Sequence, residues 1–218
     1  MLGGSVAGET EDWRAAGFGG TEKDGSMTEV IRVLRREHAN MAALVKTLEW
    51  QVAQFEAGGR PDYDVVRNVV EYFLSFPDLY HHPKEDLVFA RLKARAPEAT
   101  ERIGDLRREH EALLARSREL SAGLRAVLNE AHVPRESFVN WARAFIDLQM
   151  RHMNMEECEF FPAALQSLTA DDWHDLEAQM TAPDDPLFGE RVGERYDTLR
   201  KKILEWQAEH QQSTQGGR

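Results

Sequence analysis

The sequence predicts an all-α protein: an up-down-up-down four-helix bundle with a carboxy-terminal helical extension. Two observations lead to this fold class. Apolar residues recur at spacings of three and four along most of the 218-residue chain, which is the period of one face of a helix. The breaks in this pattern are short and contain glycine or proline, as turns between antiparallel helices do. We expect a flexible leader at 1–26, the bundle at 27–168, and a helical extension and tail at 169–218.

The leader and the first two helices follow from composition and from the breaks in periodicity. Residues 1–26 contain seven glycines and no apolar period, so they offer no helix face that packs on a core. Met27, directly after this segment, is a second candidate for the initiating methionine. The first helix starts at about 28 and ends at AGGRPD (57–62), whose glycines and proline stop it. Pro77 predicts a kink or a break in the second helix near Ser75–Pro77.

Two more turns divide the rest of the bundle. ARAPEAT (94–100) precedes a third helix that carries Ile103, and NEAHVPRES (129–137) precedes the fourth helix. Beyond the bundle we expect a short helix at 170–181 and a last helix from about 190 to 211. The last helix has an apolar stripe that we expect to dock on the bundle, consisting of Val192, Tyr196, Leu199 and Ile203.

Composition excludes several classes of partner and compartment. The formal charge of −11 repels phosphate backbones and no basic stripe offsets it, so we expect no nucleic-acid partner. No apolar run approaches membrane-spanning length, and the first residues lack the basic-then-apolar order of a secretory signal. The single cysteine excludes an intrachain disulfide and fits a reducing compartment. We therefore expect a cytoplasmic protein without a membrane partner.

A repeat organises the bundle. The pentapeptide LRREH occurs at 34–38 and again at 106–110. Each copy is followed by a second shared pattern, His-x3-Glu-acid-x2-Phe, which begins at His81 and at His152. The lone histidine and the second pattern are 43 residues apart in the first copy and 42 in the second. A coincidental pentapeptide would not bring a partner motif at a matching distance, so the chain repeats one αα unit.

Helix geometry predicts that the repeated polar residues meet inside the bundle. His38 and His81 each lie 19 residues from the expected turn between their helices, and the distances in the second copy are 20 and 18. At 1.5 Å per residue, antiparallel packing brings the four histidines to one height. The glutamate four positions after a motif histidine shares its helix face. The expected cluster consists of His38, His81, Glu85, His110, His152 and Glu156.

Six polar side chains in an apolar interior need partners, because burying each without one costs about 1–3 kcal/mol. Two divalent cations bridged by the carboxylates and capped by the imidazoles would satisfy all six. Imidazole and carboxylate ligands without thiolate suit iron, manganese or zinc, and such bundle sites are typically di-iron or di-manganese. His82 is the alternative to His81, but it points about 100° away on a helix, so we expect it beside the ligands or at the surface.

These residues resemble a known family. His38, HHPKED at 81–86, His110 and HMNMEE at 152–157 are similar to the hemerythrin and HHE cation-binding superfamily, over about 28–167. The resemblance implies a four-helix bundle with two non-haem Fe ions that bind or react with dioxygen, peroxide or nitric oxide. Carried over by position, it implies bridges at Glu85 and Glu156 and terminal ligands at His38, His81, His110 and His152.

One position departs from the oxygen carriers of this superfamily. Respiratory hemerythrins have a second histidine one turn after the third-helix ligand, where this chain has Leu114. Four histidines and two glutamates are more similar to the bacterial proteins implicated in the repair of iron centres. We therefore expect open coordination positions on both irons, which favours reactivity, with an external protein as electron donor if the chain turns over. The alternative is an iron- or oxygen-sensing or buffering module that acts through a protein partner, and enzyme activity stays open.

Glu37 and Glu109 precede the lone histidines in the two copies. We expect them to pair with neighbouring arginines on the helix surface. Support of the metal ligands is the alternative role.

Overall fold

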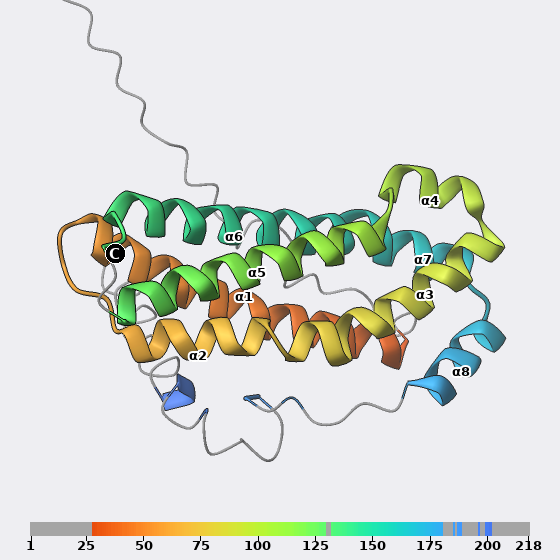
Figure 1. Cartoon of the computed structure of the whole chain (residues 1–218). Helices are drawn as coiled ribbons and strands as arrows, with labels where there is room; N and C mark the ends of the chain where they lie inside the picture. Colours follow the sequence, from red (N-terminus) through yellow and green to blue (C-terminus); the bar gives the residue numbers. More distant parts are fainter. Residues whose placement is uncertain are drawn as a thin grey trace, which may run out of the picture.

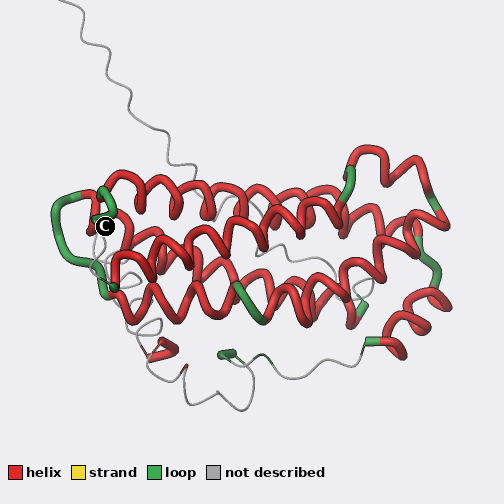
Figure 2. Tube along the Cα trace, in the orientation of Figure 1, coloured by secondary structure: helices red, strands yellow, loops and turns green. Residues whose placement is uncertain are grey.

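The computed structural model describes residues 28–129, 132–180, 185, 187–188, 196 and 199–201. Every regular element within these residues is helical, so the predicted all-α class is confirmed (Figure 2). Four long helical segments lie along one another, as Figure 1 shows. The expected leader at 1–26 and most of the expected helix at 190–211 lie outside the described residues.

The first long segment is α1 (Glu29–Glu56). The side chain of Thr28 caps its start by accepting a hydrogen bond from the backbone N–H of Ile31, at 3.4 Å. Gly58 follows the helix with a φ of 89°, a left-handed conformation that glycine adopts without steric cost. The predicted stop at AGGRPD is therefore confirmed.

The second segment is interrupted where its proline predicted a break. It comprises α2 (Tyr63–Phe73), one π-helical stretch η1 (Pro77–His81) and α3 (His82–Arg95). Asp62 caps its start with hydrogen bonds from the N–H groups of two residues in the first turn. In η1 the N–H of His82 bonds to the carbonyl of Pro77, five residues earlier. This widened turn sets the direction of the histidines that follow it.

The third helix starts later than the sequence indicates. Ile103 belongs to a separate short helix, α4 (Pro97–Ile103), and not to the long helix α5 (Leu106–Leu128). Gly104 separates them with a φ of 83°, and Asp105 caps α5 through the N–H of Arg108 at 3.2 Å. A left-handed glycine ends one helix and the capping aspartate after it begins the next, and the apolar period alone does not show this boundary.

The fourth segment comprises α6 (Arg135–Met155), a second π-helical stretch η2 (Glu156–Phe160) and α7 (Phe161–Ser167). The predicted short helix follows as α8 (Ala170–Gln179), which starts with a capping box formed by Thr169 and Asp172. Arg91 and Arg95 of α3 donate hydrogen bonds to Asp172, whose side chain is buried. These bonds fasten α8 to the bundle.

We expect Asp172→Asn to lower the urea midpoint of unfolding. Hydrogen bonding from Arg95 holds the pKa of Asp172 below its usual range. A carboxylate with a lowered folded-state pKa stabilises the fold above its unfolded-state pKa of about 3.9, and this stabilisation is lost as pH falls. The difference between wild type and variant should therefore be full at about pH 6 and shrink below about pH 3.9. A difference that stays constant across this range would contradict the assignment.

Two apolar clusters fill the interior on either side of a polar layer. The first is built from the later half of α1, α2, the later half of α5, and α6. The second is built from the start of α1, α3, α4, the start of α5, α7 and α8. Along α1, for example, the second cluster ends at Leu34 and the first begins at Met41. The predicted metal ligands lie in the interval between the clusters.

Part of the carboxy-terminal region packs on the bundle. Tyr196 and Leu199 are fully buried in the first apolar cluster, as expected for the stripe on the last helix, whereas Val192 and Ile203 lie outside the described residues. Tyr72 of α2 donates a hydrogen bond to Asp185 at 2.9 Å, so Asp185 lies on the same face.

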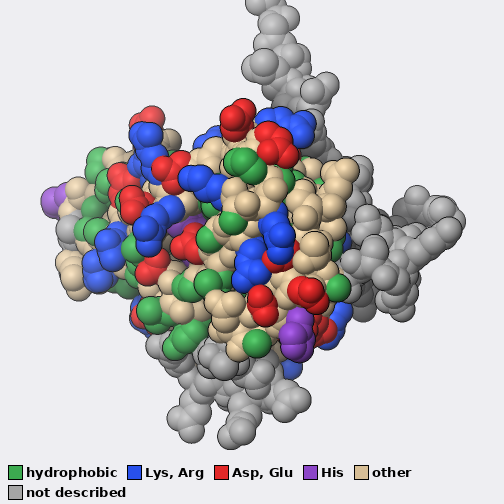
Figure 3. Space-filling model, turned by 90° about the vertical axis from the view of Figure 1, so that its right-hand side faces the viewer, with side chains coloured by type: hydrophobic (Ala, Val, Ile, Leu, Met, Phe, Trp, Pro, Cys, Tyr) green, Lys and Arg blue, Asp and Glu red, His purple; other side chains and the backbone are tan. Residues whose placement is uncertain are grey.

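No helix in the described part of the chain has the length and apolar character needed to cross a membrane. Figure 3 views the end of the molecule at which α3, α4 and α8 lie in Figure 1. Acidic and basic side chains are interspersed on this face, so its charge is mixed and not of one sign.

Candidate metal centre

All six sequence-predicted ligands converge in the layer between the apolar clusters. One histidine comes from each long segment: α1, the end of η1, α5 and α6. The two glutamates come from the first turn of α3 and from the start of η2. All six side chains are buried, and Glu85 and Glu156 have no exposed surface. The helix-rise argument thus placed these residues together correctly.

Glu85 touches histidines of both repeats. Its Oε1 lies 3.3 Å from His38 Nε2 and 3.0 Å from His81 Nε2. Its Oε2 lies 3.4 Å from His110 Nε2, on the other repeat. One carboxylate therefore faces both halves of the cluster.

Glu156 takes a related position from the other repeat. Its Oε2 lies 3.2 Å from His38 Nε2 and 3.2 Å from His152 Nε2. Its Oε1 is farther from His110 Nε2, at 3.8 Å. The contacts of Glu156 thus also cross between the repeats, although less evenly than those of Glu85.

His82 is buried in the same cluster, at 6% exposure, so of the two expected positions it takes the one beside the predicted ligands and not the one at the surface. Its ring stacks on that of His110 with centroids 3.9 Å apart and planes 7° from parallel. It also meets the ring of His152 edge-on, at 6.0 Å. The 100° step between neighbouring residues holds for a regular α-helix, whereas a π-helical stretch ends at His81, so that step does not fix the direction of His82. Both adjacent histidines point inward.

The donor atoms form two groups that could each hold one cation. The atoms of each group lie within 4.8 Å of one another. One group is His38, His81, Glu85 and Glu156, and the other is His82, Glu85, His110 and His152. Glu85 belongs to both groups, so the two positions are adjacent.

The donor set fits divalent cations. Within the described residues, no hydrogen-bond partner is present for the four oxygens of Glu85 and Glu156 or for the Nε2 atoms of His38, His81, His110 and His152. They approach one another at 3.0–3.8 Å without hydrogen-bond alignment. Polar atoms buried in this way each cost about 1–3 kcal/mol, and bound cations would satisfy them together. Imidazole and carboxylate donors suit iron, manganese and zinc.

Two glutamates hold the opposite edge of the motif histidines. Glu37 Oε2 lies 2.8 Å from His81 Nδ1, and Glu109 Oε2 lies 3.0 Å from His152 Nδ1. The expectation that both pair with surface arginines is therefore wrong, because both carboxylates contact histidines of the cluster. Glu37 is also buried, at 6% exposure, and accepts a hydrogen bond from the buried ammonium of Lys84. A carboxylate on Nδ1 leaves Nε2 free to face the cluster.

The lone histidines are held from the opposite repeat. Glu157 Oε1 lies 2.9 Å from His38 Nδ1, and Asp86 Oδ1 lies 3.4 Å from His110 Nδ1. Glu157 and Asp86 occupy the acid position that directly follows the motif glutamate in each copy. The acid in the repeated pattern was therefore the signal for these residues, and sequence reasoning gave it no role.

The charge balance of the cluster favours cations. Burial lowers the pKa of His38, but the adjacent carboxylates of Glu156 and Glu157 favour the charged imidazolium, outweigh burial and raise that pKa well above its usual value. Burial also lowers the pKa of His110. The carboxylates of Asp86, Glu156 and Glu85 outweigh this effect and raise that pKa to about 11. His82 behaves differently: burial and the neighbouring His110 lower its pKa well below its usual value. A neutral imidazole has a lone pair available for a cation.

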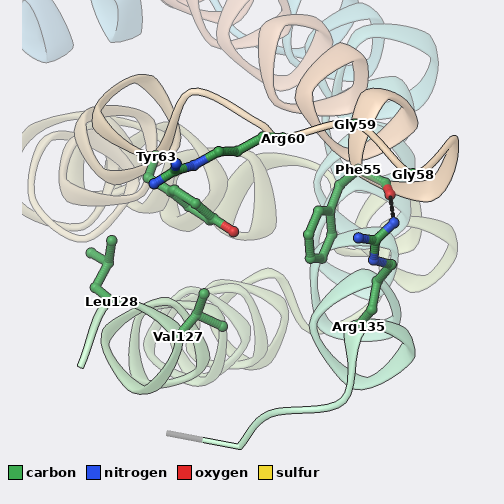
Figure 4. Close-up of a pocket in the computed structure, with 8 residues that line it drawn as sticks. All are labelled: Phe55, Gly58, Gly59, Arg60, Tyr63, Val127, Leu128 and Arg135. Atoms are coloured by element: carbon green, nitrogen blue, oxygen red, sulfur yellow. Dashed lines mark hydrogen bonds between the residues drawn. The ribbon is translucent and has the colours of Figure 1, made fainter. Parts of the chain in front are cut away.

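A surface pocket of about 500 Å³ lies elsewhere, where α1 and α5 end and α2 and α6 begin. Figure 4 shows Arg135 donating a hydrogen bond to the carbonyl of Phe55, at 2.9 Å, with its guanidinium beside the Phe55 ring. Phe55 is 17 residues from His38 along α1, which is about 25 Å at 1.5 Å per residue. The pocket is therefore separate from the histidine and glutamate cluster.

Helices around two groups of buried imidazole and carboxylate donors define a helical metal-binding domain. Comparison with known families agrees: the model of the hemerythrin HHE cation-binding domain matches residues 23–164, and the chain belongs to this family. Searches of curated proteins and of solved structures gave no match.

Proposed function

We propose that the chain is a non-haem di-iron protein whose iron pair binds or reacts with dioxygen, peroxide or nitric oxide. The observation that carries this proposal is the carboxylate of Glu85, which belongs to two adjacent groups of buried donors. The ligands in this proposal are His38, His81, Glu85, His110, His152 and Glu156, within an up-down-up-down bundle. Manganese and zinc accept the same donors, so the identity of the metal is decided by measurement.

An iron pair, when bound, supplies redox chemistry and positions for a small ligand. The residues of the chain hold and orient the donors for it. Glu37, Glu109 and Glu157 keep a proton on the Nδ1 atoms of their histidines, which directs Nε2 inward. The two apolar clusters exclude water from both sides of the layer. Dioxygen, peroxide and nitric oxide are small enough to reach donors that are this deeply buried, which favours them over larger substrates.

Metal content tests the proposal directly. Protein prepared from iron-replete medium is expected to contain two irons per chain, because the two donor groups share one carboxylate and neither is exposed. Elemental analysis together with circular dichroism checks this. A folded, helical protein with one metal per chain or none would overturn the di-iron assignment.

Reactivity decides between the uses of such a site. We expect anaerobically reduced protein to change its visible absorption when mixed with dioxygen, peroxide or nitric oxide. Recovery on removal of dioxygen would indicate a carrier or a sensor, and repeated consumption of peroxide or of nitric oxide with a reductant would indicate an enzyme. A single change that never cycles would favour iron buffering or a partner-dependent role, in the cytoplasm that we propose as its compartment.

A further inference from the structure

One histidine of the cluster has no counterpart in the repeat. Aligning the two His-x3-Glu motifs places Met153 opposite His82. Met153 is buried in the first apolar cluster, at 1% exposure, so an apolar side chain packs well at this position of the repeated unit. A buried imidazole at the equivalent position therefore needs a reason that packing does not supply.

The surroundings of His82 give that reason. Neither of its ring nitrogens has a hydrogen-bond partner in the described part of the chain. By contrast, a carboxylate is hydrogen-bonded to Nδ1 of His38, His81 and His152. A ring nitrogen of His82 lies within 4.8 Å of the donor atoms of Glu85, His110 and His152. The imidazole is thus held beside three prospective ligands without a proton-accepting partner of its own.

We propose that His82 is a fifth histidine ligand, bound to the cation that Glu85, His110 and His152 also hold. This inference rests on the proposed di-metal function and adds a ligand to it. The added donor comes from the first residue of α3, directly after η1, and the residue one turn after His110, Leu114, supplies none. The two donor groups then differ in kind: one has three histidines and Glu85, and the other has His38, His81, Glu85 and Glu156.

His82→Phe tests the proposal, because phenylalanine keeps a flat ring that stacks on His110 and removes both nitrogens. The metal-free full chain is titrated with ferrous iron under anaerobic conditions, in competition with a chelator. We expect the variant to bind one iron as wild type does and the second at least about 10-fold more weakly. Mössbauer spectra of wild type loaded with iron-57 should show two unequal sites of equal area, and the variant should change one of them. His174→Phe, on the exposed face of α8, is the control for loss of a histidine and should match wild type.

The outcomes separate this inference from the function on which it rests. If wild type itself fails to bind two irons, the proposed function fails. If wild type binds two irons and His82→Phe binds both with unchanged affinity and spectra, only the role of His82 is overturned. Unchanged iron binding with altered nitric oxide binding would also overturn it, because His82 would then contact the small ligand and not the cation. Should the Phe variant fail to fold, His82→Leu, which also removes both ring nitrogens and resembles the apolar Met153 of the other repeat, is titrated with the same expectations.

Discussion

Replacing Glu85 with alanine is expected to remove both cations. The Glu85 carboxylate belongs to both donor groups, and its oxygens contact histidines of both repeats at 3.0–3.4 Å. Its loss leaves each group with three donors and removes a negative charge that two buried cations require. Iron content should fall from two per chain to well below one, with the visible absorption of the iron pair lost.

His38→Ala is the matched comparison, because His38 belongs to one group only. It should weaken one site and spare the other, so that about one iron remains. Glu156→Ala should act in the direction of Glu85→Ala, with a smaller effect, since the Glu156 contact to His110 is long at 3.8 Å. Chelator competition on the metal-free chains ranks the three variants. Full iron content and an unchanged spectrum in Glu85→Ala would show that this carboxylate is not shared.

The repeat and the helix period were enough to predict the all-α class and the meeting of six polar residues. The prediction that they converge depends on the number of residues between each histidine and the turn that joins its helix to the next. An error of one or two residues in the position of a turn shifts the expected height of a histidine by only about 1.5–3 Å, so the prediction tolerates such errors. The start of the third helix was missed because Gly104 and Asp105 act through backbone conformation and capping, which leave the apolar pattern unchanged.

Two features of the site could not be predicted from a helical period of 3.6 residues. The π-helical stretch before His82 rotates successive side chains by a different angle from a regular α-helix. The direction of His82 could therefore not be predicted from the direction of His81. The carboxylates on the Nδ1 atoms were visible as acids at repeated positions, but helix statistics favour surface pairing for such residues. The role depends on whether a histidine of another helix lies within reach of the carboxylate, and that is a result of the tertiary packing. Glu37 shows this most clearly, since it is next to two arginines in sequence and bonds to His81 and Lys84 in the fold.

Glu37→Ala is expected to lower both stability and metal affinity, for two separable reasons. The buried ammonium of Lys84 loses the carboxylate to which it donates, and an unpaired buried charge costs about 3–5 kcal/mol. His81 loses the partner that fixes its Nδ1 proton, and removal of such a partner typically weakens metal binding by about 10–100-fold. Urea unfolding of the metal-free chain measures the first effect, and chelator competition measures the second.

The repeat supplies the control. Glu109 holds His152 Nδ1 at 3.0 Å as Glu37 holds His81, but its side chain is 42% exposed and accepts no bond from a buried lysine in the described structure. Glu109→Ala should therefore weaken metal binding with only a small loss of stability. Adding Lys84→Met to Glu37→Ala should restore most of the stability and leave the metal affinity low, because it removes the unpaired charge and not the freedom of His81. Equal destabilisation by Glu37→Ala and Glu109→Ala, or no recovery in the double variant, would show that the Lys84 charge is not the cause.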